Sequence, residues 1–480
     1  MTSPKPTQPD APDPRRWKAL SLLALADFVV ILDATIVNIA LPSVGRALHA
    51  SNSSLSWVIS AYVLAFGGLL LLGGRLADLF GRRRMFIAGL AVFGAASLAG
   101  GLSSSIGELI TFRALQGVGA AMLAPAARAL VTALFKDGPE RAKALGLWAA
   151  VAGSGTVVGL VLGGVLTSGL SWRWVLFVNV PVIVFAAVMA PRLIDESRAH
   201  STDRSIDVPG AILISGGVLA ALYAVIKAPG AGWGSTQTIG LLATAAALTA
   251  TFIRVESRSR SPLVPLRMFR LRDVRGANIA MVLMAAAMVG MFFTLTLYQQ
   301  QVQHYTALKA GLAQVPLGLI LIALAGAAGP IVDRIGVKAT LLTGLSMFAG
   351  GIAWLSQITA RGSYLADVLG PTLIIGAGLG LAFVALTVAS ATGVHEDHHG
   401  TAGGLINMTQ QLGGAIGLAI ATAVATSQTH GTDPHSLTHG FRGALIASTA
   451  IAATAIIAAL ATLARRAHPI NDAPAIPATA

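Results

Sequence analysis

The feature that most constrains this chain is a succession of apolar runs, each about 20 residues long, separated by short polar loops. A helix rises about 1.5 Å per residue, so a helix of this length crosses the hydrocarbon layer of a bilayer. Fourteen such runs are present, at residues 18–41, 55–76, 85–104, 109–132, 143–168, 174–193, 208–227, 238–255, 277–299, 309–331, 339–358, 365–391, 402–427 and 440–464. The sequence therefore predicts an all-α, polytopic membrane protein with fourteen transmembrane helices.

The composition agrees with a membrane protein and excludes several other classes. Hydrophobic residues make up 55% of the 480 and charged residues only 11%, whereas soluble domains carry about 25% charged residues. The chain has no cysteine, so disulfides and thiolate chemistry are ruled out. It shows no nucleophile–base set, phosphate-binding loop or nucleic-acid motif. We expect no enzyme activity, no cofactor, no nucleic-acid partner and no metal, even at His395, His398 and His399.

The positions of the charged residues predict the orientation of the chain. The formal net charge is +13, and most of the 33 Lys and Arg residues fall in loops on the side of the N-terminus. Loops rich in Lys and Arg stay in the cytoplasm, so both termini are expected there, with a disordered tail over residues 1–17 and a second tail over 465–480. The Arg-rich stretch 254–275 is expected to contact anionic lipid on the same face.

A charged loop occurs twice, once in each half of the chain. The first copy is GRLADLFGRRR, Gly74 to Arg84, and the second is GPIVDRIGVK, Gly329 to Lys338. Gly, Asp and Gly keep the same spacing in both copies, as expected for an internal repeat. The repeat predicts two six-helix bundles that move against each other, with two helices inserted between them. The predicted units are an N-terminal bundle at 18–193, two linker helices with a basic cytoplasmic segment at 194–276, and a C-terminal bundle at 277–464.

Further stretches resemble the motifs of one transporter family. They are LDATIVNIALP at 32–42, WVISAYVL at 57–64, RALQGVGAAMLAPA at 113–126, SWRWVLFVNVP at 171–181, YQQQVQHYTALKAGLAQVP at 298–316 and GTAGGLINMTQQLGGAIGLA at 400–419. Together with the loop at 74–84, the chain resembles the fourteen-helix drug:proton antiporters of the major facilitator superfamily over about residues 18 to 465. The resemblance implies a major facilitator fold and proton-coupled efflux of drugs or antibiotics.

In that family, the loop between the second and third helices is a cytoplasmic gate, and its Asp faces the end of a helix in the other bundle. The resemblance therefore implies a gate made of Gly74, Asp78, Gly81, Arg82, Arg83 and Arg84. Leu79 stands where the family often has a basic residue, which would weaken the charge network of the gate. The alternative is a plain cytoplasmic anchor that follows the positive-inside rule.

Charges within the apolar runs predict a proton-sensitive site. Arg113 cannot lose its proton in a protein, so within the fourth helix it needs an acidic partner or a water-filled cavity. Asp33 lies at a similar depth in the first helix, which runs the opposite way. We expect the two to pair, either as a static ion pair or as a switch that opens when Asp33 is protonated. Asp27, on the same helix face as Asn38, is the second candidate proton site, with a plain hydrogen bond to a neighbour as the alternative.

Amides inside the apolar runs predict the substrate cavity. Polar side chains at this depth line a wet cavity or bond between helices, and both roles remain open for this set. We expect the cavity to lie among the first, fourth, ninth and thirteenth helices. Its predicted lining residues are Asn38, Gln116, Tyr298, Gln299, Asn407 and Gln410.

Glycines recur at every fourth position of the fifth helix, at Gly155, Gly159 and Gly163, with Gly164 beside them. This bare stripe lets another backbone approach closely. The resemblance identifies it with the family's antiport motif, although Leu160 stands where the family has Pro and the kink that Pro produces is lost. A packing role alone is the alternative.

These features predict a proton-coupled exporter of small lipophilic compounds or antibiotics, working by alternating access in a bacterial cytoplasmic membrane. Its partners would be a small-molecule substrate, protons and membrane lipids, and the chain would function as a monomer. A proton-linked importer or an exporter of one specific metabolite would have the same architecture. A channel and a non-transporting membrane sensor are the remaining alternatives.

Overall fold

The structure is a computed structural model that describes residues 15–135, 139–197, 208–258, 266–394, 399–431 and 433–463. Every regular element among these residues is a helix. Most of the two predicted tails, part of the basic segment, and His395 and His398 lie outside the described residues.

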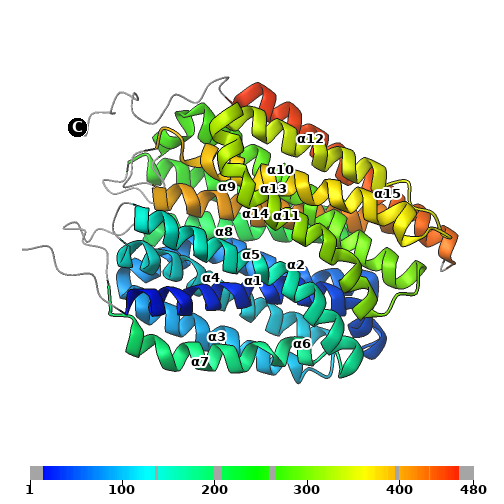
Figure 1. Cartoon of the computed structure of the whole chain (residues 1–480), viewed down its shortest axis with the longest axis horizontal. Helices are drawn as coiled ribbons and strands as arrows, with labels where there is room; N and C mark the ends of the chain where they lie inside the picture. Colours follow the sequence, from blue (N-terminus) through cyan, green and yellow to red (C-terminus); the bar gives the residue numbers. More distant parts are fainter. Residues whose placement is uncertain are drawn as a thin grey trace, which may run out of the picture.

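The long helices run side by side and form one elongated bundle (Figure 1). Their bounds are α1 Arg16–Ala47, α2 Asn52–Phe80, α3 Arg82–Gly101, α4 Ile106–Leu134, α5 Pro139–Gly169, α6 Trp174–Phe177, α7 Asn179–Leu193, α8 Val208–Ala231, α9 Thr236–Glu256, η1 Leu266–Arg270, α10 Arg272–Leu297, η2 Tyr298–Val302, α11 Ala307–Ile335, α12 Val337–Leu355, η3 Tyr364–Leu369, α13 Gly370–Ala391, α14 His399–Gln428 and α15 Pro434–Thr462. Short elements continue or interrupt predicted spans: α6 precedes α7, η2 follows α10 and η3 precedes α13.

Thirteen helices among the described residues are long and apolar enough to cross a membrane. This finding confirms the prediction of an all-α, polytopic membrane protein. The helix α5 contributes a shorter apolar stretch of described residues, Val158–Gly169. A fourteenth span therefore stays a prediction.

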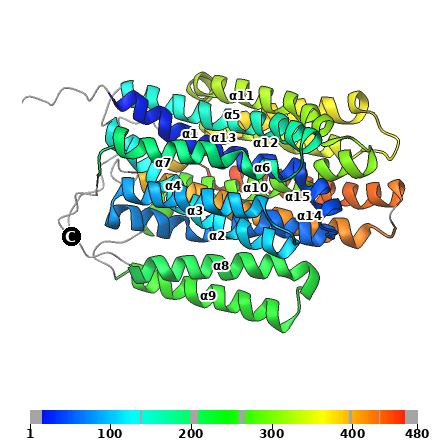
Figure 2. The ribbon, with the colours of Figure 1, turned by 90° about the horizontal axis from the view of Figure 1, so that it is seen from below.

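The helices fall into two groups and an added pair. Helices α1 to α7, which we call the N-terminal group, pack on one another, as α2 does on α4 and α1 does on α5. Helices α10 to α15, the C-terminal group, do the same, as α10 does on α14 and α12 does on α13. The groups meet through α5 with α11 and α2 with α14. The pair α8 and α9 lies along one side of the bundle (Figure 2), where α8 contacts both α2 and α14.

Two glycines with left-handed backbone conformations mark the two copies of the charged loop. Gly81 has φ +106° and Gly336 has φ +85°, a region that side chains other than glycine rarely adopt. Each ends one long helix and precedes the next. We call the end of the bundle that holds Gly81 the charged-loop end. The side chain of Lys338 bonds there to the carbonyl of Leu463 at 2.7 Å, and α1 begins and α15 ends at this same end (Figure 1).

Several helices begin at the opposite end with a side-chain cap. Ser51, Ser105, Thr306 and Asp433 each accept the backbone N–H three residues further on, at 3.0–3.3 Å. The first N–H groups of a helix have no partner within it, so these polar residues define where α2, α4, α11 and α15 start.

The predicted glycine stripe of α5 packs against α1. A Cβ atom added at Gly155, Gly159 or Gly163 would lie 3.0 Å from an atom of α1 in each case. Gly164 faces α11 instead, where its Cβ would lie 2.5 Å from Cα of Leu308. Small residues therefore bring α5 close to α1 within its own group and to α11 in the other group.

The contact of α5 with α11 gives a first testable prediction. A Cβ atom at Gly311 would lie 2.1 Å from the carbonyl oxygen of Leu160, so Gly311→Ala must push the two helices apart. We expect it to lower the free energy of unfolding in detergent by about 1–3 kcal/mol, the usual cost of overpacking. Gly326→Ala is the matched control on α11, because a Cβ there meets nothing within 4 Å. Equal stability of the two variants would contradict the close contact.

Candidate functional site

A fully buried ion pair joins α1 to α4. Asp33 is 0% exposed and Arg113 is 1% exposed, and the Arg113 guanidinium donates through Nη1 to Oδ2 of Asp33. The two residues come from helices that run in opposite directions, and they meet at the same depth, as their positions in the sequence predict. A charge within a membrane protein is costly unless it is paired in this way.

Two amides complete the shell of donors around the carboxylate. Nδ2 of Asn179, the first residue of α7, donates to Oδ1 of Asp33 at 2.7 Å. Nε2 of Gln116 donates to the same oxygen at 3.2 Å. Both amide side chains are buried. An ionised carboxylate only accepts hydrogen bonds, so this set of donors suits the charged form of Asp33.

The arginine is held by partners other than the carboxylate. Its Nη1 donates to Oε1 of Gln116 at 2.8 Å, and its Nε donates to the carbonyl of Val58 at 3.2 Å. The guanidinium carbon lies 4.4 Å from the ring centroid of Tyr62, a distance at which a cation is attracted to an aromatic face. The carbonyl and the ring both belong to α2, so the cation connects α1, α2 and α4.

Ser97 ties the amides to the rest of the group. Its hydroxyl accepts from Gln116 and from Asn179, each at 3.1 Å, and donates to the carbonyl of Leu176 at 2.9 Å. The network therefore reaches from α1 to α7 within the N-terminal group. A proton on Asp33 would remove the counter-charge of Arg113, and an uncompensated buried charge costs about 3–5 kcal/mol. The expected switch at Asp33 stays a prediction.

A second arginine contacts the C-terminal group. Arg128 on α4 donates through Nη1 to the carbonyl of Gly403 on α14 at 3.3 Å. With its amide oxygen turned toward the guanidinium, Asn407 accepts from Arg128 at 2.9 and 3.0 Å. The guanidinium carbon lies 5.2 Å from the ring centroid of Trp148. Asp27 on α1 is half-buried, and among the described residues no ion pair within 4.0 Å joins it to Arg128. Asn407, which the sequence assigns to the substrate cavity, thus binds this cation, and the role of Asp27 as a proton site stays a prediction.

The remaining predicted cavity residues lie in separate places. Asn38 donates to the carbonyl of Ala34 on its own helix at 3.0 Å. Gln410 is half-buried on α14. With Gln116 in the ion-pair network and Asn407 at Arg128, the structure does not bring the six residues into one cluster. Their contact with substrate stays a prediction.

The end of α10 carries the other two predicted cavity residues. The Tyr298 hydroxyl donates to the carbonyl of Thr359 at 2.8 Å. Oε1 of Gln299 accepts from Gln314 at 3.1 Å, while Nε2 of Gln299 is buried without a hydrogen-bond partner among the described residues. Both lie on η2, the π-helical turn that also holds Gln300.

The charged loop at Gly74–Arg84 makes its contacts within the N-terminal group. Nη2 of Arg82 lies 3.3 Å from Oδ1 of Asp78. Glu196, just after α7, accepts from the backbone N–H of Arg83 at 3.0 Å and lies 3.7 Å from Nε of Arg84. The carboxylate also comes so close to Gly81 that a Cβ there would lie 2.5 Å from it. The expected contact of Asp78 with the other bundle stays a prediction.

Several of these partners are absent from the residues that the sequence singles out. Asn179 and Ser97 hold the ion pair, Arg128 joins the two groups, and Glu196 holds the charged loop. Arg128 does carry a signal, because a cation within an apolar run needs a partner. The sequence signal at Asn179 and Ser97 is weaker, since neutral polar residues occur throughout the spans.

The network gives a second prediction. Asn179→Ala removes a hydrogen bond to a buried charge, so we expect it to lower the free energy of unfolding in mixed micelles by about 1–3 kcal/mol. Asn38→Ala is the matched control, because that amide bonds to its own helix backbone, and we expect it to change stability by less than about 1 kcal/mol. A loss for Asn179→Ala no larger than for Asn38→Ala would show that the amide does not hold Asp33.

Known proteins agree with this architecture. The model of the Major Facilitator Superfamily matches residues 23–418. The chain is 40% identical to a puromycin resistance protein of Streptomyces alboniger, over 89% of this chain and 87% of the relative. It is also 40% identical to a cephamycin export protein of Amycolatopsis lactamdurans, over 92% of this chain and 93% of the relative.

Solved structures show the same fold. A bacterial homologue of the human lysosomal transporter Spinster, in an inward-facing and unoccupied conformation, aligns with a TM-score of 0.66 and 15% sequence identity. The alignment covers 96% of this chain and 100% of that chain. The predicted fold class is thereby confirmed. The chain belongs to the major facilitator superfamily, and it is a transporter rather than an enzyme.

Proposed function

We propose that this chain is a proton-coupled exporter of small lipophilic compounds, antibiotics among them, and that it works as a monomer in the bacterial cytoplasmic membrane. The observation that carries proton coupling is the buried pair of Asp33 and Arg113 with its shell of donors. The relatives that confer puromycin resistance and export cephamycin support the class of substrate.

The charged-loop end of the bundle faces the cytoplasm in this proposal. The loops rich in Lys and Arg gather there, as the positive-inside rule requires. That α1 begins and α15 ends at this same end (Figure 1) supports an even number of spans. The helix α5, which is 31 residues long, is the fourteenth span in this proposal.

Coupling begins at the ion pair. A proton that reaches Asp33 from outside neutralises the carboxylate, which frees Arg113 and two amides to take other partners. Helices α1, α2, α4 and α7 all contribute to this network, so its rearrangement changes how they pack. The N-terminal group then has two arrangements, one for each protonation state of Asp33.

This rearrangement would break the hydrogen bonds between the two groups and form others. Near the outer end, Ser168 accepts from the backbone N–H of Leu308 at 3.1 Å, and Gln300 donates to the carbonyl of Ile39 at 3.0 Å. Closer to the cytoplasm, Arg128 binds α14. We propose that Arg128 is an inner latch between α4 and α14, and that the charged loop with Glu196 braces the helices beside it.

The energy available is sufficient for export. One charge that moves across about 150 mV yields roughly 3.5 kcal/mol. That free energy sustains a concentration ratio of a few hundredfold. One proton per substrate molecule would therefore be enough to protect a cell from an antibiotic.

A susceptibility panel tests the proposal. The chain is expressed in a drug-sensitive bacterium and challenged with puromycin, a cephamycin and chemically diverse lipophilic antibiotics and dyes. We expect the inhibitory concentration of at least one compound to rise severalfold. Asp33→Asn should abolish the rise, because an amide in place of the carboxylate cannot carry the proton. Asp433→Asn is the matched control, since Asn also caps a helix well.

Each contrary outcome is informative. If no compound becomes less toxic although the protein is present in the membrane, export of such compounds is wrong. If a compound becomes more toxic, the chain imports it. If Asp33→Asn protects cells as well as the unmodified chain does, coupling through Asp33 is wrong, whereas export itself stands.

A further inference from the structure

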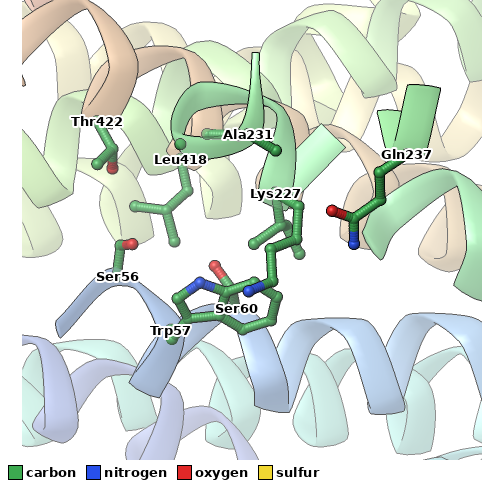
Figure 3. A pocket seen from close by; sticks show the side chains of 11 residues that line it. Ser56, Trp57, Ser60, Lys227, Ala231, Gln237, Leu418 and Thr422 are labelled. Carbon is green, nitrogen blue, oxygen red and sulfur yellow. The ribbon is translucent and has the colours of Figure 1, made fainter. Parts of the chain in front are cut away.

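A cavity of about 290 Å³ lies at the end opposite the charged loop, between α2, α8, α9 and α14. Its walls thus come from the N-terminal group, the C-terminal group and the inserted pair. In Figure 3, Ser56, Trp57 and Ser60 lie at the bottom of the view, Thr422 lies above them, and Lys227 and Gln237 lie toward the right. We call it the linker cavity. The residues of the ion-pair network and of the Arg128 contact do not line it.

The cation of the linker cavity is Lys227. Its ammonium lies 5.3 Å from the ring centroid of Trp57, across the contact between α8 and α2. No lining residue is acidic, and within the described part of the chain no carboxylate lies within 4.0 Å of this ammonium. A positive charge is therefore held at the cavity wall with an aromatic face as its partner.

Thr422 adds a hydrogen-bonding group that is not used. Its side chain is 9% exposed, and Oγ1 is buried with no hydrogen-bond partner among the described residues. Buried polar groups are nearly always bonded, so a buried hydroxyl without a partner needs an explanation. A ligand in the linker cavity would supply the missing bond. Ser60, on the facing wall, is 1% exposed and presents a second hydroxyl there.

The rest of the wall is formed by apolar residues near the helix ends opposite the charged loop. Ile226, Gly230, Ala231, Leu418 and Ala419 complete the lining. Ser60 lies eight positions after Asn52, the first residue of α2, which places it about 12 Å inside the helix end. Trp57 is closer to the helix end than Ser60, and tryptophan is enriched in membrane proteins where acyl chains meet headgroups. In the neighbouring helix α9, only 17% of the most apolar stretch is buried, as expected for a helix that faces lipid.

We propose that the linker cavity binds an acidic phospholipid. Its phosphate would pair with Lys227 and accept from Thr422 and Ser60, and the start of its acyl chains would lie against Trp57 and Leu418. A neutral ligand would leave the ammonium without a counter-charge, and a small soluble anion would leave the apolar wall unused. Because the walls belong to both groups, a bound lipid would join α2 to α14 through the inserted pair.

The test measures lipid binding by the purified full chain in detergent. Dioctanoyl phosphatidylglycerol is titrated and binding is followed by native mass spectrometry, beside dioctanoyl phosphatidylcholine and glycerol phosphate. We expect phosphatidylglycerol to bind more tightly than either of the others. Lys227→Gln should weaken its binding roughly fivefold, the effect of losing one lysine at an anionic headgroup. Thr422→Val, which keeps the shape of the side chain, should weaken it too.

Lys309→Gln is the matched control. Lys309 is exposed, its ammonium lies 3.9 Å from the ring centroid of Tyr305, and it does not line the linker cavity. Equal weakening by Lys309→Gln and Lys227→Gln would show non-specific attraction and overturn the proposal. It is also overturned if phosphatidylcholine binds as tightly as phosphatidylglycerol, or if glycerol phosphate does so without acyl chains. Thermal melting of each variant confirms that the protein is folded.

Discussion

The structure depends on one interaction, the buried pair of Asp33 and Arg113. In a chain with so few charges, two opposite charges at the centre of a helix group must find each other, because neither is stable alone in an apolar surrounding. Their partners extend the constraint to the neighbouring helices: Asn179 brings the start of α7 to the carboxylate, and Val58 brings α2 to the guanidinium. The N-terminal group is thus organised around this buried pair of charges.

The two groups meet through glycine contacts, a polar contact and apolar packing. Near one end, glycines of α5 and α11 let the backbones meet. Deeper in the bundle, Arg128 reaches across to the carbonyl of Gly403. Apolar side chains of both groups also belong to one continuous buried cluster, as Val37 on α1 and Met281 on α10 do. We propose that these contacts between the groups separate and form again during transport.

The sequence predicted much of this, for physical reasons that can be named. Apolar run length predicts spans because the bilayer sets the length of a helix, and the pairing of Asp33 with Arg113 follows from depth and from the cost of an unpaired charge. Asn179 and Glu196 were missed because their partners, on α1 and α3, are distant in the sequence. Only the packing of α7 against these two helices brings them together. The linker cavity was missed for a similar reason: Lys227 and Thr422 meet only because the inserted pair docks against both groups.

The central claim is that Asp33 takes up the transported proton, and infrared difference spectroscopy tests it most directly. The purified protein is taken from neutral to acidic pH while the C=O stretch of protonated carboxylic acids is recorded, in the unmodified chain and in Asp33→Asn. We predict that a carboxylic acid band from a buried group appears in the unmodified chain and in Asp433→Asn and is missing in Asp33→Asn. The same band in Asp33→Asn would contradict the account, because the proton would then reside on another acid.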